Sequence, residues 1–370
     1  MNHLVISAHD YRSRRRAGIH FVAEELAKRG MTRFFSCQYS FLSKLKSDPR
    51  ISLDNFANRV TVKDNIECYL WKTLIQPFSL HAKSLCLLEK MMFEIYLYRC
   101  SPVLVKWICE AEVIFFESGI APIFFDLVKR LNPSARTVYV ASDDLSTINV
   151  AFYVKKVFER VAPDFDMLCL KSKIMAANIP GNSNKYVIPH GFDYSIVDHS
   201  DPSPYGEGIH AVSVGSMLFD IQFFQIASEL FPQITFHVIG SGMERPEKLP
   251  DNVRFYGEMP YLMTLPYIKH ATLGLAPYFS EDLPAYLADT SLKLMQYDFF
   301  QLPAICPVDV VGDYDSRFGY IPRNSPSIDR AIRTALAAPT PVAKRQLNWS
   351  AAVDRMLNPK DFPETKLGAS

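Results

Sequence analysis

Short apolar runs alternate with amphipathic stretches along most of the chain. The first apolar run is HLVISA at 3–8, and the stretch that follows at 19–30 places apolar residues on one helical face and ends at Gly30. Apolar runs of strand length that are each followed by such a helix are typical of a parallel sheet with crossover helices. The pattern therefore predicts an α/β protein.

The alternation is interrupted once and then restarts. Further strands are expected at 113–119, 137–144, 167–172, 186–191, 209–217, 234–242, 253–259, 271–278 and 303–308. Residues 192–208 are rich in Asp, Ser, Pro and Gly and have no apolar period, so they are expected to link two domains. We expect two Rossmann-like parallel-sheet domains facing a cleft: an N-terminal domain at 1–200, rejoined by residues 346–370, and a C-terminal domain at 201–345.

Length and charge agree with this picture and exclude several classes of protein. The 370 residues exceed what one ordinary core supports, and a net charge of +1 argues against a nucleic-acid-binding protein. The seven cysteines form no CxxC pair, which favours free thiols in a reducing compartment. The N-terminus has no signal-peptide pattern and no apolar stretch is long enough to span a bilayer, so a cytoplasmic protein is expected.

Residues 83–110 are apolar almost all round, with scattered Lys and Arg. Helices of this kind are usually interior, and a buried helix pair is the favoured interpretation. The alternative is an interfacial segment whose basic side chains reach lipid head groups. A basic cluster in the first βα loop, made of Arg12, Arg14, Arg15 and Arg16, would suit an acceptor or membrane surface, a solvated loop or an anion site.

Ligands of open α/β sheets bind at the carboxyl ends of the strands, and this rule selects Asp143 as a general base. A carboxylate there can accept a proton from a sugar hydroxyl, although its position also suits helix capping. Glu117 is a competing carboxylate, with a structural role at a helix N-terminus as its alternative.

The segment 286–307, YLADTSLKLMQYDFFQLPAICP, suits an anion site. Asp289, Thr290 and Ser291 can cap the following helix and leave its first N–H groups free for a diphosphate. Lys293 adds a positive charge that would stabilise a departing nucleoside diphosphate without a metal. An ordinary capped helix has a similar sequence.

Other strand ends carry residues that would suit a nucleotide, although each of them alone is more often ordinary surface or core. Glu258 suits the ribose hydroxyls, and Met217 and Tyr278 suit the base. The GSG at 240–242 lacks the third glycine of a dinucleotide fingerprint, and no P-loop occurs. The DxD-like runs at 164–166 and 313–315 are expected to be turns.

Several stretches resemble the inverting glucuronosyltransferases of xanthan- and acetan-type exopolysaccharide assembly, which have the B-type glycosyltransferase fold. The likeness covers nearly the whole chain and is most specific in ASDDLSTINVA and in YLADTSLKLMQYDFF. It implies UDP-glucuronate as donor and a polyprenyl-diphosphate-linked oligosaccharide ending in mannose as acceptor. It also implies a peripheral protein on the cytoplasmic face of the inner membrane, and inversion with no metal or other cofactor.

The resemblance also assigns roles to residues. Asp143 matches the catalytic base, and the nucleotide-contacting positions are Met217, Glu258, Tyr278, Leu287, Thr290, Ser291, Lys293 and Gln296. Gln296 stands where a ribose-binding glutamate is common, which favours Glu258 for the ribose. Asp144 stands where the family tends to have glycine, and we expect its charge to raise the pKa of Asp143. The alternatives are a UDP-sugar epimerase, a transferase for another UDP-sugar and a non-catalytic membrane-associated binding protein.

Overall fold

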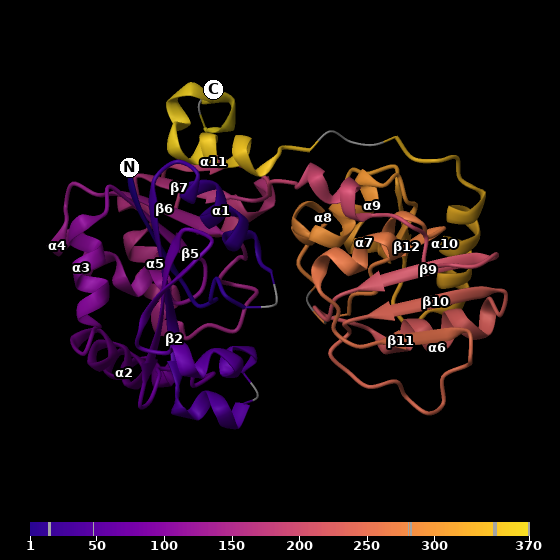
Figure 1. Cartoon of the computed structure of the whole chain (residues 1–370), viewed down its shortest axis with the longest axis horizontal. Coiled ribbons are helices and arrows are strands. Elements are labelled where there is room, and N and C mark those ends of the chain that lie inside the picture. Colours follow the sequence, from indigo (N-terminus) through magenta and orange to yellow (C-terminus); the bar gives the residue numbers. More distant parts are fainter. Residues whose placement is uncertain (14–15, 47, 280, 282, 343–345, 369–370) are drawn as a thin grey trace. The chain divides into compact units, whose positions relative to one another are not determined.

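The computed structural model consists of two compact units (Figure 1). It describes residues 1–13, 16–46, 48–279, 281, 283–342 and 346–368. The first unit combines Met1–Gly191 with Trp349–Ser370, and the second is the continuous segment Phe192–Asn348. The sequence placed the boundaries at 200 and 345. The first boundary falls earlier because Phe192 and Ile196 pack with Leu265 and Met295 in a core cluster of the second unit.

The N-terminal unit contains an eight-stranded sheet in the order β3-β4-β2-β1-β5-β6-β7-β8. Its strands are β1 (Asn2–Ser7), β2 (Met31–Ser40), β3 (Val60–Lys63), β4 (Ile66–Thr73), β5 (Val113–Glu117), β6 (Arg136–Ala141), β7 (Met167–Leu170) and β8 (Lys185–Val187). All neighbouring pairs are parallel except β3 and β4. The sequence pattern predicted β1 and β5 to β8 and missed β2 to β4.

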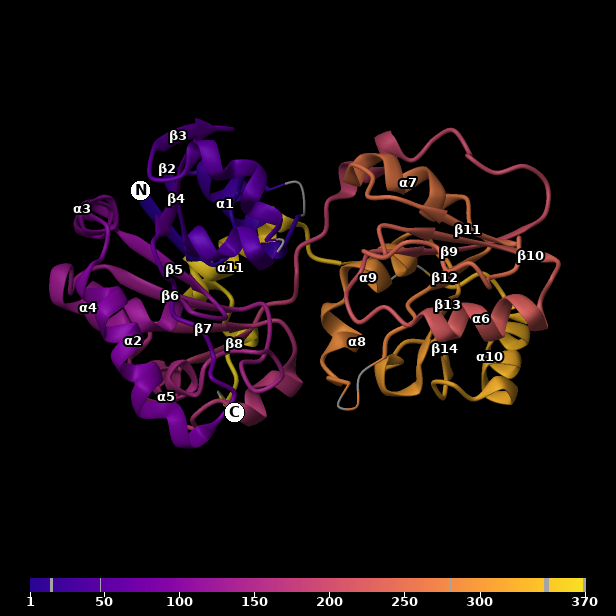
Figure 2. The ribbon, with the colours of Figure 1, turned by 90° about the horizontal axis from the view of Figure 1, so that it is seen from below.

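Two layers of helices cover this sheet (Figure 2). On one face lie α1 (Gly18–Ala27) and α11 (Trp349–Leu357), and on the other lie α2 (Cys86–Tyr98), α3 (Pro102–Glu110), α4 (Phe125–Leu131) and α5 (Phe152–Val161). Val5 pairs in register with Phe34 and Phe115, and this row belongs to the core under α1 and α11. Because strand side chains alternate, the next residues along these strands face the opposite helices.

The C-terminal helix α11 is part of the N-terminal unit's core. The Trp349 ring stacks on Phe21 of α1 with ring centroids 5.0 Å apart. Arg29, just after α1, donates to Asp354 of α11 at 2.8 Å, and Arg136 of β6 donates to the Met356 carbonyl at 2.5 Å. Residues from both ends of the chain therefore complete one core.

Residues 83–110 do not form the buried helix pair that the sequence favoured. Leu104, Trp107 and Ile108 of α3 are buried, but α2 buries only Glu89, Phe93 and Tyr96. Its outer face exposes large apolar side chains: Leu87, Leu88, Met91, Ile95 and Tyr98. The sequence of α2 is apolar on two faces, because one face packs on the N-terminal unit and the other is apolar but exposed to solvent.

Glu89 ties α2 to α5 from a fully buried position. One of its carboxylate oxygens accepts from the backbone N–H of Leu80 at 2.9 Å. The other accepts from the N–H of Tyr153 in the first turn of α5, also at 2.9 Å. The N-cap residue of α5, Ala151, has no side-chain acceptor. Glu89, which is distant in the sequence, therefore accepts the hydrogen bond from a backbone N–H at the start of α5.

The C-terminal unit has a six-stranded parallel sheet in the order β11-β10-β9-β12-β13-β14. Its strands are β9 (Ile209–Val214), β10 (Ile234–Ile239), β11 (Val253–Tyr256), β12 (Leu273–Leu275), β13 (Ala304–Pro307) and β14 (Arg317–Tyr320). Helices α6 (Ile221–Leu230) and α10 (Ser325–Ala337) lie on one face, and α7 (Tyr261–Lys269) and α9 (Leu292–Phe299) on the other, with the short α8 (Leu287–Thr290) before α9 (Figure 2). Both units are thus parallel-sheet α/β domains, as the sequence predicted.

Candidate active site

The ends of three adjacent strands bring a carboxylate and two serines together in the N-terminal unit. Glu117 ends β5 and is 3% exposed. It accepts hydrogen bonds from the hydroxyl of Ser7, at the end of β1, and from that of Ser142, just after β6, the latter at 3.1 Å. The competing carboxylate of the sequence prediction is therefore held inside the fold beside the candidate base.

Asp143 follows Ser142, and its backbone N–H donates to Ser118 Oγ at 3.0 Å. Burial raises the pKa of Asp143, and the negative charge of Glu117 raises it further, while His9 acts in the opposite direction. A raised pKa makes the carboxylate a stronger base. The capping alternative is wrong, because the next helix, α5, begins only at Phe152 and has Ala151 as its cap.

Asp144 does not have the effect that we expected on its neighbour. The causes that raise the pKa of Asp143 are burial and Glu117, and Asp144 is not among them. Its side chain instead turns into its own loop, where it accepts from the Ser146 N–H at 2.8 Å and from Asn178 Nδ2 at 2.7 Å. The like-charge neighbour predicted for Asp143 exists, but it comes from β5 and is distant in the sequence.

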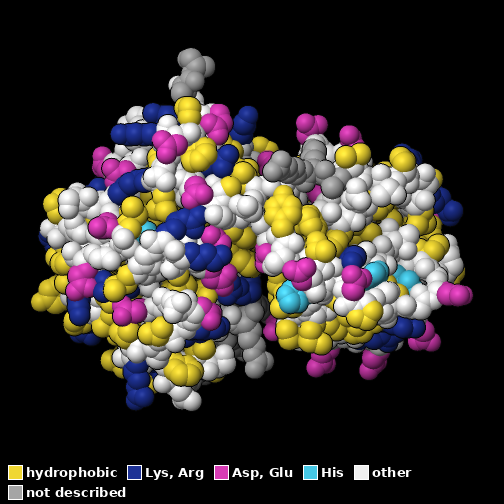
Figure 3. Space-filling view, turned by 45° about the horizontal axis from the view of Figure 1, so that its top comes forward, with side chains coloured by type: hydrophobic (Ala, Val, Ile, Leu, Met, Phe, Trp, Pro, Cys, Tyr) yellow, Lys and Arg dark blue, Asp and Glu magenta, His cyan; other side chains and the backbone are white. Residues whose placement is uncertain are grey.

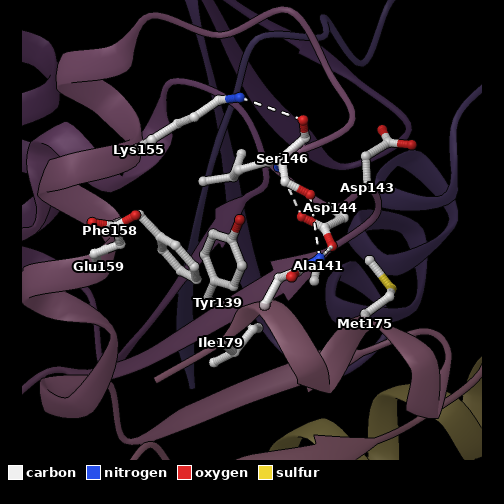
Figure 4. Close-up of a pocket in the computed structure, with 12 residues that line it drawn as sticks. Tyr139, Ala141, Asp143, Asp144, Ser146, Lys155, Phe158, Glu159, Met175 and Ile179 are labelled. Atoms are coloured by element: carbon white, nitrogen blue, oxygen red, sulfur yellow. Dashed lines mark hydrogen bonds between the residues drawn. The ribbon is translucent and has the colours of Figure 1, made fainter. Parts of the chain in front are cut away.

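A pocket opens next to Asp143 (Figure 4). Its described lining comes from β6, the loop after it, α5 and the segment before β8: Tyr139, Ala141, Asp143, Asp144, Leu145, Ser146, Lys155, Phe158, Glu159, Met175, Asn178 and Ile179. Of these, the sequence had singled out only the two aspartates. The others come together only when α5 folds back over β6, and no local pattern in the sequence signals that.

The expected basic cluster is partly engaged within the fold. Arg12 forms a bidentate salt bridge with buried Asp10 and donates a further hydrogen bond to Thr61 Oγ1 at 2.7 Å. The Arg12 side chain is 7% exposed. Arg16 pairs with Glu24. Arg14 and Arg15 lie outside the described residues. Arg12 and Arg16 thus have carboxylate partners of their own.

In the C-terminal unit, Ser291 is the N-cap of α9. Its side-chain oxygen accepts from the N–H of Leu294 at 3.3 Å and lies 2.6 Å from the Tyr278 hydroxyl. The cap that the sequence predicted at Ser291 is confirmed, whereas Thr290 and Asp289 belong to α8 together with buried Leu287. The helix points its free N–H groups and the positive end of its dipole toward this turn.

Lys293 sits in the first turn of α9, above the Tyr278 ring, with Nζ 4.9 Å from the ring centroid. Burial lowers the pKa of Lys293 to about 7. Among the residues that the structure describes, no carboxylate pairs with it. A partly buried ammonium without a counter-ion is suited to bind an anion, which would restore its charge.

The remaining predicted nucleotide residues differ in their surroundings. Gln296 donates to the Tyr261 hydroxyl at 3.0 Å and is buried, while Met217 and Glu258 are exposed. Tyr278 is fully buried, so its ring supports Ser291 and Lys293 and offers no open face for stacking a base.

Two further features belong to this unit: the GSG turn, which the sequence had indicated at a strand end, and a buried ion pair, which it had not. Gly240 and Gly242 both have positive φ, at 62° and 78°, so the GSG turn after β10 needs glycine for its backbone shape. Arg317 of β14 pairs with Asp298 of α9 at 2.8 Å and donates to the Ala288 carbonyl of α8 at 2.5 Å. This buried pair holds α8 and α9 in fixed positions. Within the described ranges, no cluster of three or more His, Cys, Asp or Glu is arranged to hold a metal ion.

Solved structures with the same architecture place the chain in a fold class. Sucrose-phosphate synthase from Thermosynechococcus elongatus matches 98% of this chain over 100% of its own, with a TM-score of 0.61 at 12% identity. An α,α-trehalose-phosphate synthase (UDP-forming) from Burkholderia xenovorans matches 98% of this chain over 100% of its own, with a TM-score of 0.65 at 9% identity. The protein has the fold of B-type glycosyltransferases.

Sequence comparison is more specific. Residues 5–171 match the family model described as "Glucuronosyltransferase GumK, N-terminal domain". The UDP-glucuronate:glycolipid 2-beta-glucuronosyltransferase of Xanthomonas campestris pv. campestris is 53% identical over 365 residues, which cover 99% of this chain and 91% of that protein. The chain belongs to this glucuronosyltransferase family.

Proposed function

We propose that this enzyme transfers glucuronic acid from UDP-glucuronate to the terminal mannose of a polyprenyl-diphosphate-linked oligosaccharide, with inversion at the anomeric carbon. The observation that carries the proposal is the near-full-length likeness to a relative whose name gives UDP-glucuronate as donor, a glycolipid as acceptor and a β product. Since UDP-glucuronate is an α-glycoside, a β product requires inversion.

A single displacement accounts for inversion. The acceptor oxygen forms a bond to the anomeric carbon, the bond from that carbon to the diphosphate breaks, and UDP leaves with the electron pair. Asp143 accepts the proton of the acceptor hydroxyl, supported by its raised pKa. Lys293 and the N-terminus of α9 stabilise the negative charge of the departing diphosphate, so the reaction needs no metal in this proposal.

We also propose a peripheral position on the cytoplasmic side of the inner membrane. The exposed apolar face of α2 supports the membrane contact in this proposal. Leu87, Met91 and Ile95 are each more than half exposed, and Lys83, Lys90 and Arg99 flank them. An apolar helix face flanked by basic side chains is typical of interfacial helices that bind anionic lipid. Figure 3 shows that, on the face of the N-terminal unit that it presents, apolar side chains lie among charged ones of both signs. Every helix in the described ranges is too short or too polar to span a bilayer.

The donor, the acceptor and the reaction type are tested together by one experiment. The enzyme is offered a panel of UDP-sugars with and without a mannose-terminated lipid-linked oligosaccharide, and products are identified by mass and by the anomeric coupling constant in NMR. We expect a β-glucuronide only when UDP-glucuronate and acceptor are both present. A converted UDP-sugar formed without acceptor would indicate an epimerase, and efficient use of another UDP-sugar would overturn the donor assignment.

Membrane contact is tested with a matched pair of substitutions. Ile95 on α2 and Ile321 in the C-terminal unit are both 56% exposed. Ile95→Glu is expected to reduce co-sedimentation with anionic liposomes, and Ile321→Glu is not. Equal binding by both variants would contradict the assignment of α2 as the lipid-facing helix.

A further inference from the structure

The pocket beside Asp143 has an apolar interior and a polar rim. The rings of Tyr139 and Phe158 form one wall, and Leu145, Met175 and Ile179 contribute aliphatic surface. Figure 4 shows the Tyr139 hydroxyl directed toward the middle of this space, with Asp144 and Ser146 above it. Apolar walls with a few convergent polar groups are typical of small-molecule sites.

The Tyr139 hydroxyl has no hydrogen-bond partner in the part of the chain that the structure describes. The side chain is 1% exposed, so solvent reaches it only through the pocket. Burial, together with the nearby charges of Asp144 and Asp143, raises the pKa of Tyr139 well above its usual value. The hydroxyl therefore stays protonated and can both donate and accept a hydrogen bond. A hydroxyl at the wall of a pocket, with no hydrogen bond to another described residue, is suited to bind a polar group of a ligand.

The rim residues are already fixed in place by bonds to one another. Asn178 Nδ2 lies 2.7 Å from Asp144 Oδ2 and 3.3 Å from Ser146 Oγ. Lys155 Nζ lies 3.4 Å from the Ser146 carbonyl, which holds the loop to α5. Because these side chains are already held in place, they lose little conformational entropy when a ligand binds.

The charges around the pocket indicate which kind of ligand fits. Of the described charged residues that line it, Asp143, Asp144 and Glu159 are acidic and only Lys155 is basic. A diphosphate or a glucuronate carboxylate would meet repulsion there. A neutral sugar has apolar C–H faces for the two aromatic rings and hydroxyls that donate and accept.

We propose that this pocket binds a neutral sugar of the acceptor glycan and that the Tyr139 hydroxyl forms a hydrogen bond to it. The inference rests on the proposed function and deepens it, because it places acceptor recognition within hydrogen-bonding reach of the loop that carries Asp143. Tyr139 is then a residue of acceptor specificity.

The test replaces Tyr139 by Phe, which removes only the unpaired hydroxyl and so leaves the melting temperature unchanged. We expect the KM for a mannose-terminated prenyl-diphosphate oligosaccharide to rise about three- to tenfold, which is the loss of affinity expected when one neutral hydrogen bond is removed. The KM for UDP-glucuronate stays unchanged. The matched control is Tyr186→Phe, on β8 of the same sheet and outside the pocket, which leaves both KM values unchanged.

A second variant and a second substrate sharpen the result. Ser146→Trp places a large side chain at the exposed rim and is expected to raise the acceptor KM further, while the KM for UDP-glucuronate stays unchanged. With the same oligosaccharide released from its lipid, the effect of Tyr139→Phe should remain. An effect seen only with the lipid-linked form, or an unchanged acceptor KM in both variants, would overturn the pocket assignment. Wild-type enzyme that transfers nothing to any acceptor would instead refute the proposed function.

Discussion

The two units hold ionisable groups in opposite ways. In the N-terminal unit the buried carboxylate of Glu117, at the end of β5, lies near Asp143 in the loop after β6, and burial together with Glu117 raises the pKa of Asp143. In the C-terminal unit a single lysine lies over an aromatic ring, and burial lowers the pKa of Lys293 to about 7. Both side chains are shifted toward their neutral forms. Neither Asp143 nor Lys293 is fully stabilised in its charged form by its own unit. In our proposal the acceptor hydroxyl supplies the proton that Asp143 accepts, and the diphosphate supplies the anion that pairs with Lys293.

Removing the base is expected to have the largest effect. Asp143→Asn keeps the shape of the side chain and abolishes its basicity, so transfer should fall about 10²- to 10⁴-fold, the range typical of a general base. UDP affinity, measured by calorimetry, should not change. Asp144→Asn serves as the neighbouring control and should retain most of the activity. A near-normal turnover number for Asp143→Asn would remove it from the mechanism.

Removing the cation comes next. Lys293→Met keeps the aliphatic stem and should weaken UDP binding about 10- to 100-fold, as expected for a hydrogen bond to a charged group. The wild-type affinity should fall as the pH rises above about 7, because free Lys293 then loses the proton that the diphosphate requires. The Lys293→Met variant should show no such decline. A wild-type affinity that does not change between pH 6 and pH 9 would contradict an anion role for this lysine.

A smaller effect is expected when the charge beside the base is removed. Glu117→Gln keeps one acceptor oxygen for a serine hydroxyl and replaces the other by an NH2 donor, to which Ser7 or Ser142 must turn an oxygen lone pair. The substitution also removes the negative charge that raises the pKa of Asp143. The pKa of Asp143 should fall, so the acidic limb of the kcat/KM profile should move to lower pH. The plateau should drop by roughly a few-fold because the base is weaker. A general loss of activity at every pH with no shift of the limb would indicate a purely structural role for Glu117.

The smallest effect should come from Tyr278→Phe. It removes the hydroxyl that lies 2.6 Å from the Ser291 side chain and keeps the ring beneath Lys293. One neutral hydrogen bond is worth about 1 kcal/mol, so UDP affinity should weaken up to about fivefold. Tyr278→Ala also removes the ring that helps to bury Lys293, so it should raise the pKa of Lys293 more than Tyr278→Phe does. Equal effects of the two substitutions would argue against a role for the ring.

Local patterns predicted the parts of the molecule that local physics determines. The alternation of strands and helices gave the fold class, and the Ser-Leu-Lys-Leu run gave the cap at Ser291. The β3–β4 hairpin was missed although Asp64 and Asn65, both with positive φ, form a turn dipeptide between two short strands. That signal was present in the sequence.

Other features depend on contacts between distant residues and had no local signal. The charge beside Asp143 comes from Glu117, because strands β5 and β6 pair in register. The pocket around Tyr139 depends on α5 lying over the end of β6. The exposed face of α2 was misjudged because composition alone does not indicate which apolar side chains find a partner.

The return of α11 to the N-terminal unit determines the order in which the two units can be completed during synthesis. The ribosome delivers Phe192–Asn348 in one piece, so the nucleotide-binding candidate unit has all its residues before the chain ends. The N-terminal unit is begun first, yet its core lacks Trp349, Val353 and Met356 until the residues after the second unit have emerged. Until α11 has been made, the apolar side chains of α1 and the sheet that pack against it lack these partners. Early termination near residue 348 would damage the unit that was made first and spare the one made last.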